Sequence, residues 1–178
     1  MPVQSNGVSG EITDRFICGA DLSQLRLFWV FGRPTNFPYA GFRIEYAMKT
    51  QVEFRSAKFP PYEGEEEQIN PGLWGKHLAE YLVQRLAEKG IQTQEIIAED
   101  WGWYIPIPNE GFRLAICCGH QNGEDDEFLC FTEPSTPVVK KFFRKIDATA
   151  QLTRLTEALQ QILASDPDIK AVKWIEPV

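Results

Sequence analysis

The sequence has few of the residues on which acid–base and metal chemistry depend. Only two histidines and four cysteines occur among its 178 residues. Histidine is the one side chain whose ordinary pKa lies near neutrality, so this count restricts general acid–base catalysis at physiological pH. Four cysteines are also too few for a disulfide framework. We therefore expect reduced thiols and a fold that depends on a hydrophobic core.

The sequence also lacks the short motifs of common enzymes. It contains no G-x-S-x-G nucleophile elbow, no H-E-x-x-H zinc motif, no kinase motif set and no Rossmann fingerprint. The run Gly72-Leu73-Trp74-Gly75-Lys76 is superficially like a phosphate-binding loop, but the full G-x-x-x-x-G-K-[ST] pattern is missing, and His77 stands where Ser or Thr is needed. We expect no catalytic residue and no cofactor.

Positive charge and long apolar runs are scarce as well. Eighteen Lys and Arg against 25 Asp and Glu give a net charge of -7. A chain of this sign is repelled by phosphate backbones and anionic lipid, so we expect neither nucleic acid nor a membrane as partner. The most apolar stretch, Leu25 to Phe31, is far shorter than the roughly 20 residues that span a bilayer. The N-terminal segment also lacks the pattern of a secretory signal, which favours a cytoplasmic protein.

Hydrophobic patterning predicts strands followed by a helix in the first half of the chain. The apolar run 25–31 and the partly alternating run 42–54 are typical of strands. Asn70 can cap a helix and Pro71 suits a first helical position. Apolar residues then recur at steps of three and four, which predicts a helix over 71–89.

The second half predicts a meander followed by helices. Turns rich in Gly, Asn and Pro separate three expected antiparallel strands: about 101–107, 112–120 and 127–132. Thr136 and Pro137 predict the start of a helix that reaches about residue 165, with a break or kink near 147–150. Residues 169–175 have the length and β-branched content of a last strand.

This order of elements is typical of the α+β class. We expect a mainly antiparallel sheet with a three-strand meander and with helices packed on one face. The length suits one domain, so residues 1–23 are expected to be a loose N-terminal extension and residues 24–178 a single α+β domain.

The most distinctive string is Glu99-Asp100-Trp101-Gly102-Trp103. Two carboxylates beside two tryptophans could hold a cationic or sugar-like ligand, because aromatic faces attract cations and stack on apolar surfaces. In an extended chain Trp101 and Trp103 share one face. The alternative is that both tryptophans pack in the core under a helix and that the two acids are a solvated entry to the strand.

One histidine could belong to the same site. His77 lies in the predicted helix, three residues after Trp74, and could border its buried face. The candidate residues for binding a ligand or partner are therefore Glu99, Asp100, Trp101, Trp103 and His77.

Cysteine and histidine also occur together near residue 120. Cys118 and His120 would point to one side of a strand, as a catalytic pair requires, and hairpin pairing could bring Cys130 opposite Cys117 to form part of a metal site. However, C-C-G-H is not a zinc spacing, and cysteine is commonly a small buried residue. We expect neither a catalytic pair nor a metal.

Charged residues gather in three clusters. Two are acidic and predict either solvated loops or electrostatic steering towards a basic protein partner: Glu63, Glu65, Glu66 and Glu67, and then Glu124, Asp125, Asp126 and Glu127. The third is basic and is expected to form the exposed side of an amphipathic helix: Lys140, Lys141, Arg144 and Lys145.

Several of these residues form a pattern that resembles a known group of proteins. The run Asn70-Pro71-Gly72 with Gly75-Lys76 and Leu78-Ala79, and then the string from Glu99 to Trp103, resemble a family of small uncharacterised bacterial proteins. The resemblance covers about the central fifth of the chain. It implies a bacterial origin and an α+β fold, and it supplies no catalytic residue.

Two functions follow as hypotheses. The first is a non-catalytic protein-interaction protein, of the immunity or adaptor kind, whose acidic surface or aromatic strand engages a partner of basic character. The second is a small-molecule-binding protein or hydrolase with a pocket near the strand that contains Trp101 and Trp103.

Overall fold

The computed structural model describes residues 48–120, 123–141 and 143–175. The chain divides into two units, Met1–Tyr46 and Ala47–Val178, and every described residue belongs to the second. The expected loose extension over 1–23 and the expected strand over 25–31 lie outside the described residues.

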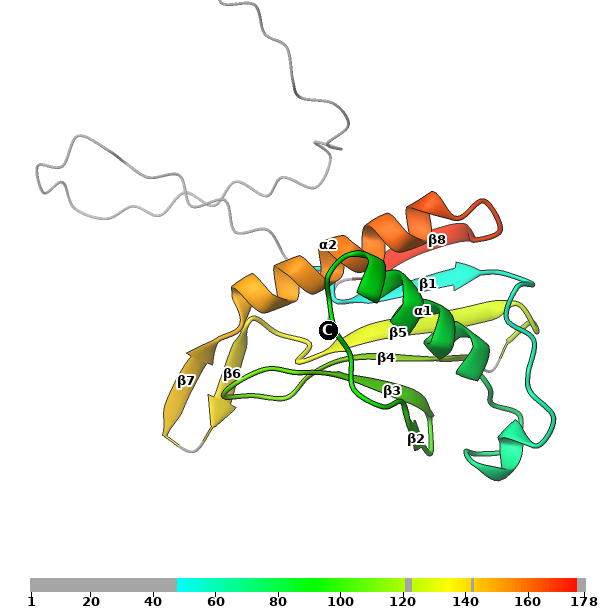
Figure 1. Ribbon diagram of the computed structural model, residues 1–178, viewed down its shortest axis with the longest axis horizontal. Helices are drawn as coiled ribbons and strands as arrows, with labels where there is room; N and C mark the ends of the chain where they lie inside the picture. The colour runs from blue at the N-terminus through cyan, green and yellow to red at the C-terminus, as the bar shows by residue number, and fades with distance from the viewer. Residues whose placement is uncertain (1–47, 121–122, 142, 176–178) are drawn as a thin grey trace, which may run out of the picture. The chain divides into compact units, whose positions relative to one another are not determined.

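Six strands form an antiparallel sheet in the order β2-β3-β4-β5-β1-β8 (Figure 1). Their bounds are β1 Gln51–Arg55, β2 Ile97–Glu99, β3 Gly102–Ile107, β4 Leu114–His120, β5 Glu127–Glu133 and β8 Lys170–Ile175. Strands β2 to β5 follow one another as hairpins, whereas β1 lies between β5 and β8. The predicted α+β class with its meander is confirmed.

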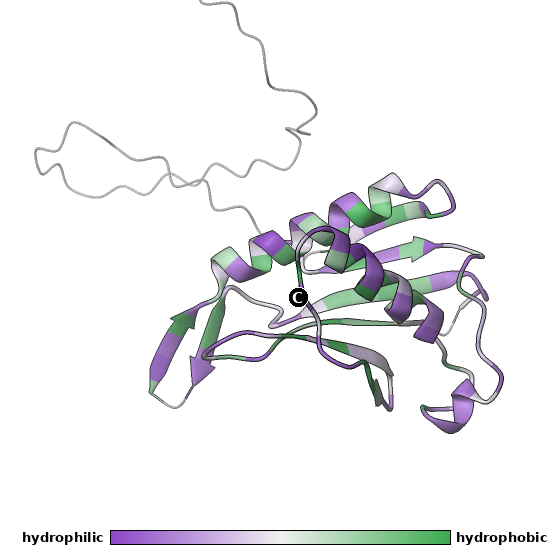
Figure 2. Cartoon of the chain, in the orientation of Figure 1, coloured by the Kyte–Doolittle hydropathy of each residue, from purple (hydrophilic) through white to green (hydrophobic). Residues whose placement is uncertain are grey.

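Two helices, α1 Lys76–Glu88 and α2 Thr149–Ser165, lie on one face of this sheet (Figure 1). Their apolar residues recur at helical spacing and are buried: Leu78, Leu82 and Leu86 in α1, and Leu152, Leu155, Leu159 and Ile162 in α2. Figure 2 shows hydrophilic residues on the side of α1 that faces the viewer. In the described part of the chain no helix is long and apolar enough to span a bilayer.

Strand alternation separates a helix face from an open face of the sheet. On the helix face, a row of paired residues runs across four strands: Trp103, Cys118, Cys130 and Val52, each at most 2% exposed. The next row points to the opposite side and consists of Tyr104, Cys117, Phe131 and Gln51. Among the described residues no helix covers this second face.

Helix α1 begins later than predicted. It starts at Lys76, and not at Pro71, because two glycines interrupt helical geometry before it. Gly72 has φ +79° and Gly75 has φ +149°, and neither conformation belongs to a right-handed helix. Asn70 therefore caps no helix; its carbonyl accepts a bond from the Leu73 amide within a turn.

The helix predicted from Pro137 is wrong in its first part. Strands β6 Val138–Lys141 and β7 Arg144–Asp147 form a two-stranded antiparallel hairpin of their own. The rest of the predicted helix is confirmed as α2. The four basic residues of the third cluster therefore lie on a hairpin and not on a helix.

Candidate functional site

The distinctive string folds as a β hairpin. Glu99 ends β2, Asp100 and Trp101 form the turn, and Gly102 opens β3 opposite Glu99. Gly102 has φ +144°, and a Cβ at this position would lie 2.7 Å from the Cys118 carbonyl oxygen. Only glycine fits a backbone packed this closely, so the turn is held directly against β4.

The hairpin turn places the two tryptophans on opposite sides of the sheet. Trp101 is 41% exposed and its ring lies 5.4 Å from that of Phe131, which belongs to the open face. Trp103 is buried on the helix face. The prediction that Trp101 and Trp103 share one face is wrong, because the chain is a turn and not an extended strand at Trp101.

Trp103 belongs to a buried structural junction. Its indole Nε1 donates a hydrogen bond of 2.7 Å to Oε1 of Glu65. The same oxygen accepts bonds from the backbone amides of Gly75, at 2.7 Å, and Lys76, at 2.8 Å, which open helix α1. Oε2 accepts a bond of 3.0 Å from the Tyr62 amide. The Glu65 carboxylate thus caps α1 from a distant loop.

Sequence reasoning missed this role of Glu65. The residue was expected in a solvated acidic loop, and it is only 1% exposed. It opens a short 3₁₀ turn, Glu65–Glu67, whose other two glutamates are exposed. One available signal is that Gly75, directly before the helix, has no side chain that could cap it, so a cap from elsewhere is required.

His77 lies on the helix side of the sheet, away from Trp101. Its ring stacks on Tyr62 at a centroid distance of 3.6 Å, and its Nδ1 lies 2.5 Å from the Pro60 carbonyl oxygen. Asp100 is exposed in the turn, and its carbonyl accepts a bond of 3.3 Å from the Asn70 amide. Of the five candidate residues, the structure brings only Glu99 and Trp101 together in one hollow.

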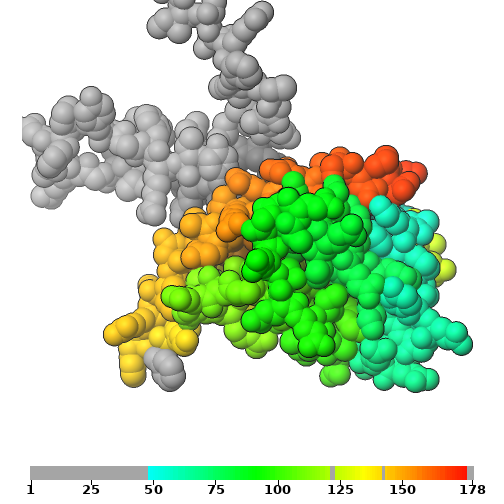
Figure 3. All heavy atoms as spheres, viewed as in Figure 1, coloured from blue at the N-terminus to red at the C-terminus, as the bar shows by residue number. Residues whose placement is uncertain are grey.

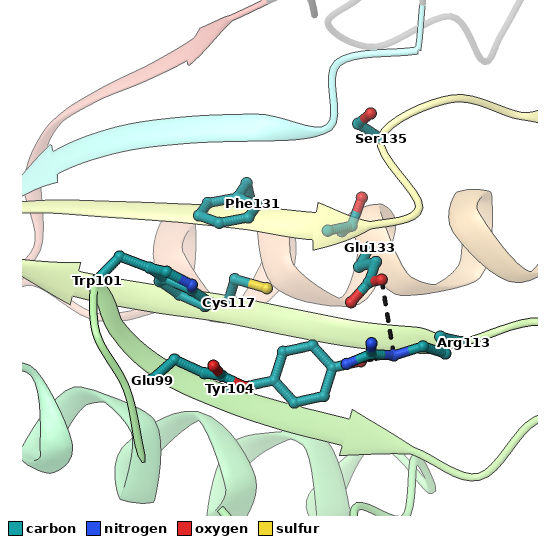
Figure 4. A pocket seen from close by; sticks show the side chains of 9 residues that line it. Glu99, Trp101, Tyr104, Arg113, Cys117, Phe131, Glu133 and Ser135 are labelled. Carbon is teal, nitrogen blue, oxygen red and sulfur yellow. Dashed lines mark hydrogen bonds and ion pairs between the residues drawn. The ribbon is translucent and has the colours of Figure 1, made fainter. Parts of the chain in front are cut away.

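That hollow lies on the open face of the sheet and has a volume of about 430 Å³ (Figure 4). The aromatic and apolar side chains that line the hollow are those of Tyr104, Cys117, Phe131 and Trp101. The charged side chains at its ends are those of Glu99, Arg113 and Glu133. Trp101 and Glu99 lie at one end, and Arg113 and Glu133 at the other.

Two contacts hold the Arg113 side chain at one end of the hollow. Its guanidinium lies 5.1 Å from the centre of the Tyr104 ring, and its Nε is 3.7 Å from Oε1 of Glu133. The end near Trp101 has the same combination of ring and carboxylate, but among the described residues no cation lies within ion-pair distance of Glu99. The charge of Arg113 acts on Glu99 only at longer range.

The thiol and the phenol in this hollow, those of Cys117 and Tyr104, both have raised pKa values. Burial raises the pKa of the Cys117 thiol well above its ordinary value. Burial also raises the pKa of the Tyr104 hydroxyl, partly opposed by the hydrogen bond that Arg113 Nε donates to it. Because the thiolate is the nucleophilic form of cysteine, Cys117 is a poor nucleophile here, and the hollow offers rings and carboxylates for contact with a ligand.

Among the described residues, two further thiols, those of Cys118 and Cys130, and the second histidine pack on the helix face. Cys130 is directly opposite Cys118, and not opposite Cys117 as predicted. A hydrogen bond between these two side chains, together with burial, raises the pKa of Cys118. His120 stacks on Trp74 at a centroid distance of 3.5 Å, and its Nδ1 has no hydrogen-bond partner among the residues that the structure describes. In the ranges that the structure describes, no three His, Cys, Asp or Glu side chains group as metal ligands.

The hollow contains residues that the sequence reasoning did not select, namely Tyr104, Arg113, Phe131 and Glu133. A signal was available for two of them, because a meander with known turns places Tyr104, Cys117 and Phe131 in one row. Comparison with known proteins adds no functional assignment: no family model, curated protein or solved structure matches this chain.

Proposed function

We propose that the protein is a non-catalytic binding protein, of the immunity or adaptor kind, which recognises a protein segment that presents an arginine or lysine. The binding surface is the hollow on the open face, and the bound cation lies between Trp101 and Glu99. One observation carries the proposal: a ring and a carboxylate without an ion-pair partner among the described residues stand at one end of the hollow, while the equivalent pair at the other end holds Arg113.

Arg113 indicates which chemistry suits the hollow. A guanidinium over an aromatic face and beside a carboxylate gains both cation–π and ion-pair energy. Within the hollow, the described residues supply such a cation at the Tyr104 end and none in contact with Glu99 at the other. A partner of basic character also suits a chain with a net charge of -7, because the field of the protein would attract it.

The surroundings of Trp101 favour a protein partner. Trp101 lines the hollow and is 41% exposed, and Ile97, which lies opposite Tyr104 on strand β2, is 45% exposed, so large apolar side chains are exposed on this face of the sheet. Tryptophan and arginine are enriched at the energetic centres of protein interfaces. An exposed tryptophan beside an unpaired carboxylate supplies one half of such a contact, and the partner's cation supplies the other.

A small cationic molecule is a second candidate, favoured by the size of the hollow. Its volume of about 430 Å³ falls within the ordinary range of small-molecule sites, roughly 300 to 1,000 Å³. A free amine or guanidine would use the same ring and carboxylate. The difference between the two candidates is whether flanking peptide backbone adds affinity.

The test is a titration observed at the indole NH of Trp101 in ¹H–¹⁵N spectra, with that signal assigned by W101F. The probes are a tetra-arginine peptide and free arginine amide. We expect the peptide to shift the signal and E99Q to weaken binding about two- to fivefold, as an exposed ion pair predicts. The matched control is E66Q, which removes an exposed carboxylate from the distant acidic loop.

Three results would decide the matter. If free arginine amide binds as tightly as the peptide, the small-molecule candidate replaces the protein partner. If E66Q weakens binding as much as E99Q, the interaction is general attraction to an acidic protein and the hollow is not its site. If neither probe shifts the Trp101 signal, cation recognition at this place is wrong.

A further inference from the structure

The β6–β7 hairpin stands apart from the six-stranded sheet. It forms a separate two-stranded sheet, and Figure 3 shows it projecting from the body of the domain. Its base is fixed: Val139 packs against the core, and the Ala148 amide donates a bond of 2.8 Å to the Pro137 carbonyl. Beyond this base, Lys141 Nζ donates a bond of 3.0 Å to the Gly111 carbonyl.

The strands of this hairpin place like charges directly opposite each other. Lys140 pairs with Lys145, and Lys141 pairs with Arg144. Like charges in facing positions destabilise an antiparallel pair, so this arrangement is unfavourable for the free hairpin. In the described part of the chain none of the four cations forms an ion pair with a carboxylate. Figure 2 shows hydrophilic residues along the outer part of the hairpin.

An aromatic residue lies in the turn between these charges. Phe143 directly precedes β7, and its side chain is fully exposed, at 105% of the reference value. Val138, at the start of β6, is also 46% exposed. Burial of a phenylalanine side chain is favourable, so an apolar surface that covered Phe143 would gain binding energy at the end of the cationic hairpin.

We propose that this hairpin docks on an anionic lipid surface. Phe143 enters the boundary between headgroups and acyl chains, while Lys140, Lys141, Arg144 and Lys145 engage the negative headgroups around it. This combination of an inserted aromatic residue and surrounding cations is the physical basis of reversible membrane attachment. An anionic surface also relieves the repulsion between the facing pairs.

The placement of the charges favours a lipid surface over a nucleic acid. Facing residues share a side of the ribbon and successive residues alternate, so two cations lie on each side of the hairpin. A plane approached by the hairpin end meets cations from both sides of the ribbon, and Lys141 exchanges its bond to the Gly111 carbonyl for a headgroup. Specific nucleic-acid interfaces are larger, roughly 600 Å² or more, and would bring more of an acidic protein against phosphates.

The net charge of -7 does not prevent this contact. Strands of four residues extend about 13 Å at the usual rise of a strand. The Debye length at physiological ionic strength is about 8 Å, so salt screens the acidic body from a surface that the hairpin end touches. The repulsion expected from the composition therefore acts on the body more than on the hairpin.

The test is co-sedimentation of the full chain with phosphatidylcholine vesicles, with and without phosphatidylserine. We expect binding only with phosphatidylserine, and weaker binding as salt rises. K140Q/K141Q/R144Q/K145Q should lower the partition coefficient about fivefold for each charge removed. F143S should lower it about tenfold. The quadruple variant should melt no lower than the wild type, because it removes the facing like charges.

The matched control is K89Q/R154Q/K170Q/K173Q, which changes the net charge equally but at four cations outside the hairpin. We expect it to bind vesicles much better than the hairpin variant. Equal loss in both variants would overturn the proposal, as would no binding by the wild type. Tighter binding to a DNA oligonucleotide than to the vesicles at the same salt would make the hairpin a nucleic-acid element instead.

Discussion

The indole of Trp103 donates its hydrogen bond to a carboxylate that lies 38 residues earlier in the chain, that of Glu65. This contact joins β3 to the loop before α1. The same carboxylate accepts the amides that open the helix, so a single buried acid fixes the position of α1 on the sheet.

We therefore expect E65A to lower the free energy of unfolding by about 3 to 5 kcal/mol, because it leaves several buried donors without an acceptor. Urea unfolding measures the change. The matched control is E66A, at the exposed neighbour in the same 3₁₀ turn, which should change stability by no more than about 0.5 kcal/mol. Similar midpoints for E65A and E66A would show that the Glu65 contact does not support the fold.

Close approach of backbones gives a second prediction. A Cβ on Gly75 would lie 2.8 Å from the Cα of Gly119, whereas a Cβ on Gly72 would meet no atom within 4 Å, although both glycines have positive φ. We expect G72A to cost about 1 to 2 kcal/mol from backbone strain alone. G75A should cost about 1 to 3 kcal/mol more, because β4 and α1 must separate. Thermal melting of the two variants measures the difference, and equal melting temperatures would contradict it.

The sequence predicted the architecture because local patterns and tertiary structure agree over most of the domain. The leucines of α2 recur at steps of three and four and all face the sheet. The meander followed from turn residues between short apolar runs, which are local signals. The helix predicted from Pro137 was wrong in its first part because the spacing of apolar residues there is ambiguous.

Val139 and Ile146 illustrate such an ambiguity. They are seven residues apart, which places them on one face of a helix after two turns. In the structure they are directly opposite each other, because the turn of the β6–β7 hairpin folds the chain back on itself between them. The spacing fits both elements, and periodicity alone does not distinguish them.

The site could be predicted only in part. Glu99 and Trp101 were selected because charged and aromatic residues are adjacent in sequence, and this adjacency survives folding. Arg113 and Glu133 come from the ends of other strands, and only the register of β4 on β5 brings them to the same hollow. Trp101 and Trp103 were expected on one face and lie on opposite faces, because the turn at Asp100 and Trp101 interrupts the alternation.

The thiols of the sheet provide a third prediction. Cys117, Cys118 and Cys130 are all buried, and the pKa values of Cys117 and Cys118 are raised. In a C18S background, we expect Ellman's reagent at pH 8 to react at least about 100-fold more slowly with the folded protein than with the protein in urea. Rapid reaction of one thiol in the folded state would identify an activated cysteine, and would contradict a site that acts by binding alone.

The last prediction concerns the alkaline limit of stability. Burial, and then the hydrogen bond of 2.9 Å that its hydroxyl donates to Asp166, raise the pKa of Tyr81 from 10.0 to about 12. Below pH 10 the tyrosine is protonated in both the folded and the unfolded chain, so its contribution to stability is fully present. Between pH 10 and 12 the unfolded chain releases its proton first, and that contribution is lost as the pH rises.

Y81F should therefore lose less stability than the wild type between pH 9 and pH 11.5, by about 1 kcal/mol. This is less than the same shift implies for a fully buried group, because water screens a partly exposed hydroxyl. Urea unfolding at the two pH values measures the difference. Y62F is the matched control, because Tyr62 also donates to a carboxylate, that of Glu80, but from an exposed position where the difference should be smaller. Parallel decline of Y81F and wild type would assign the alkaline loss to other groups.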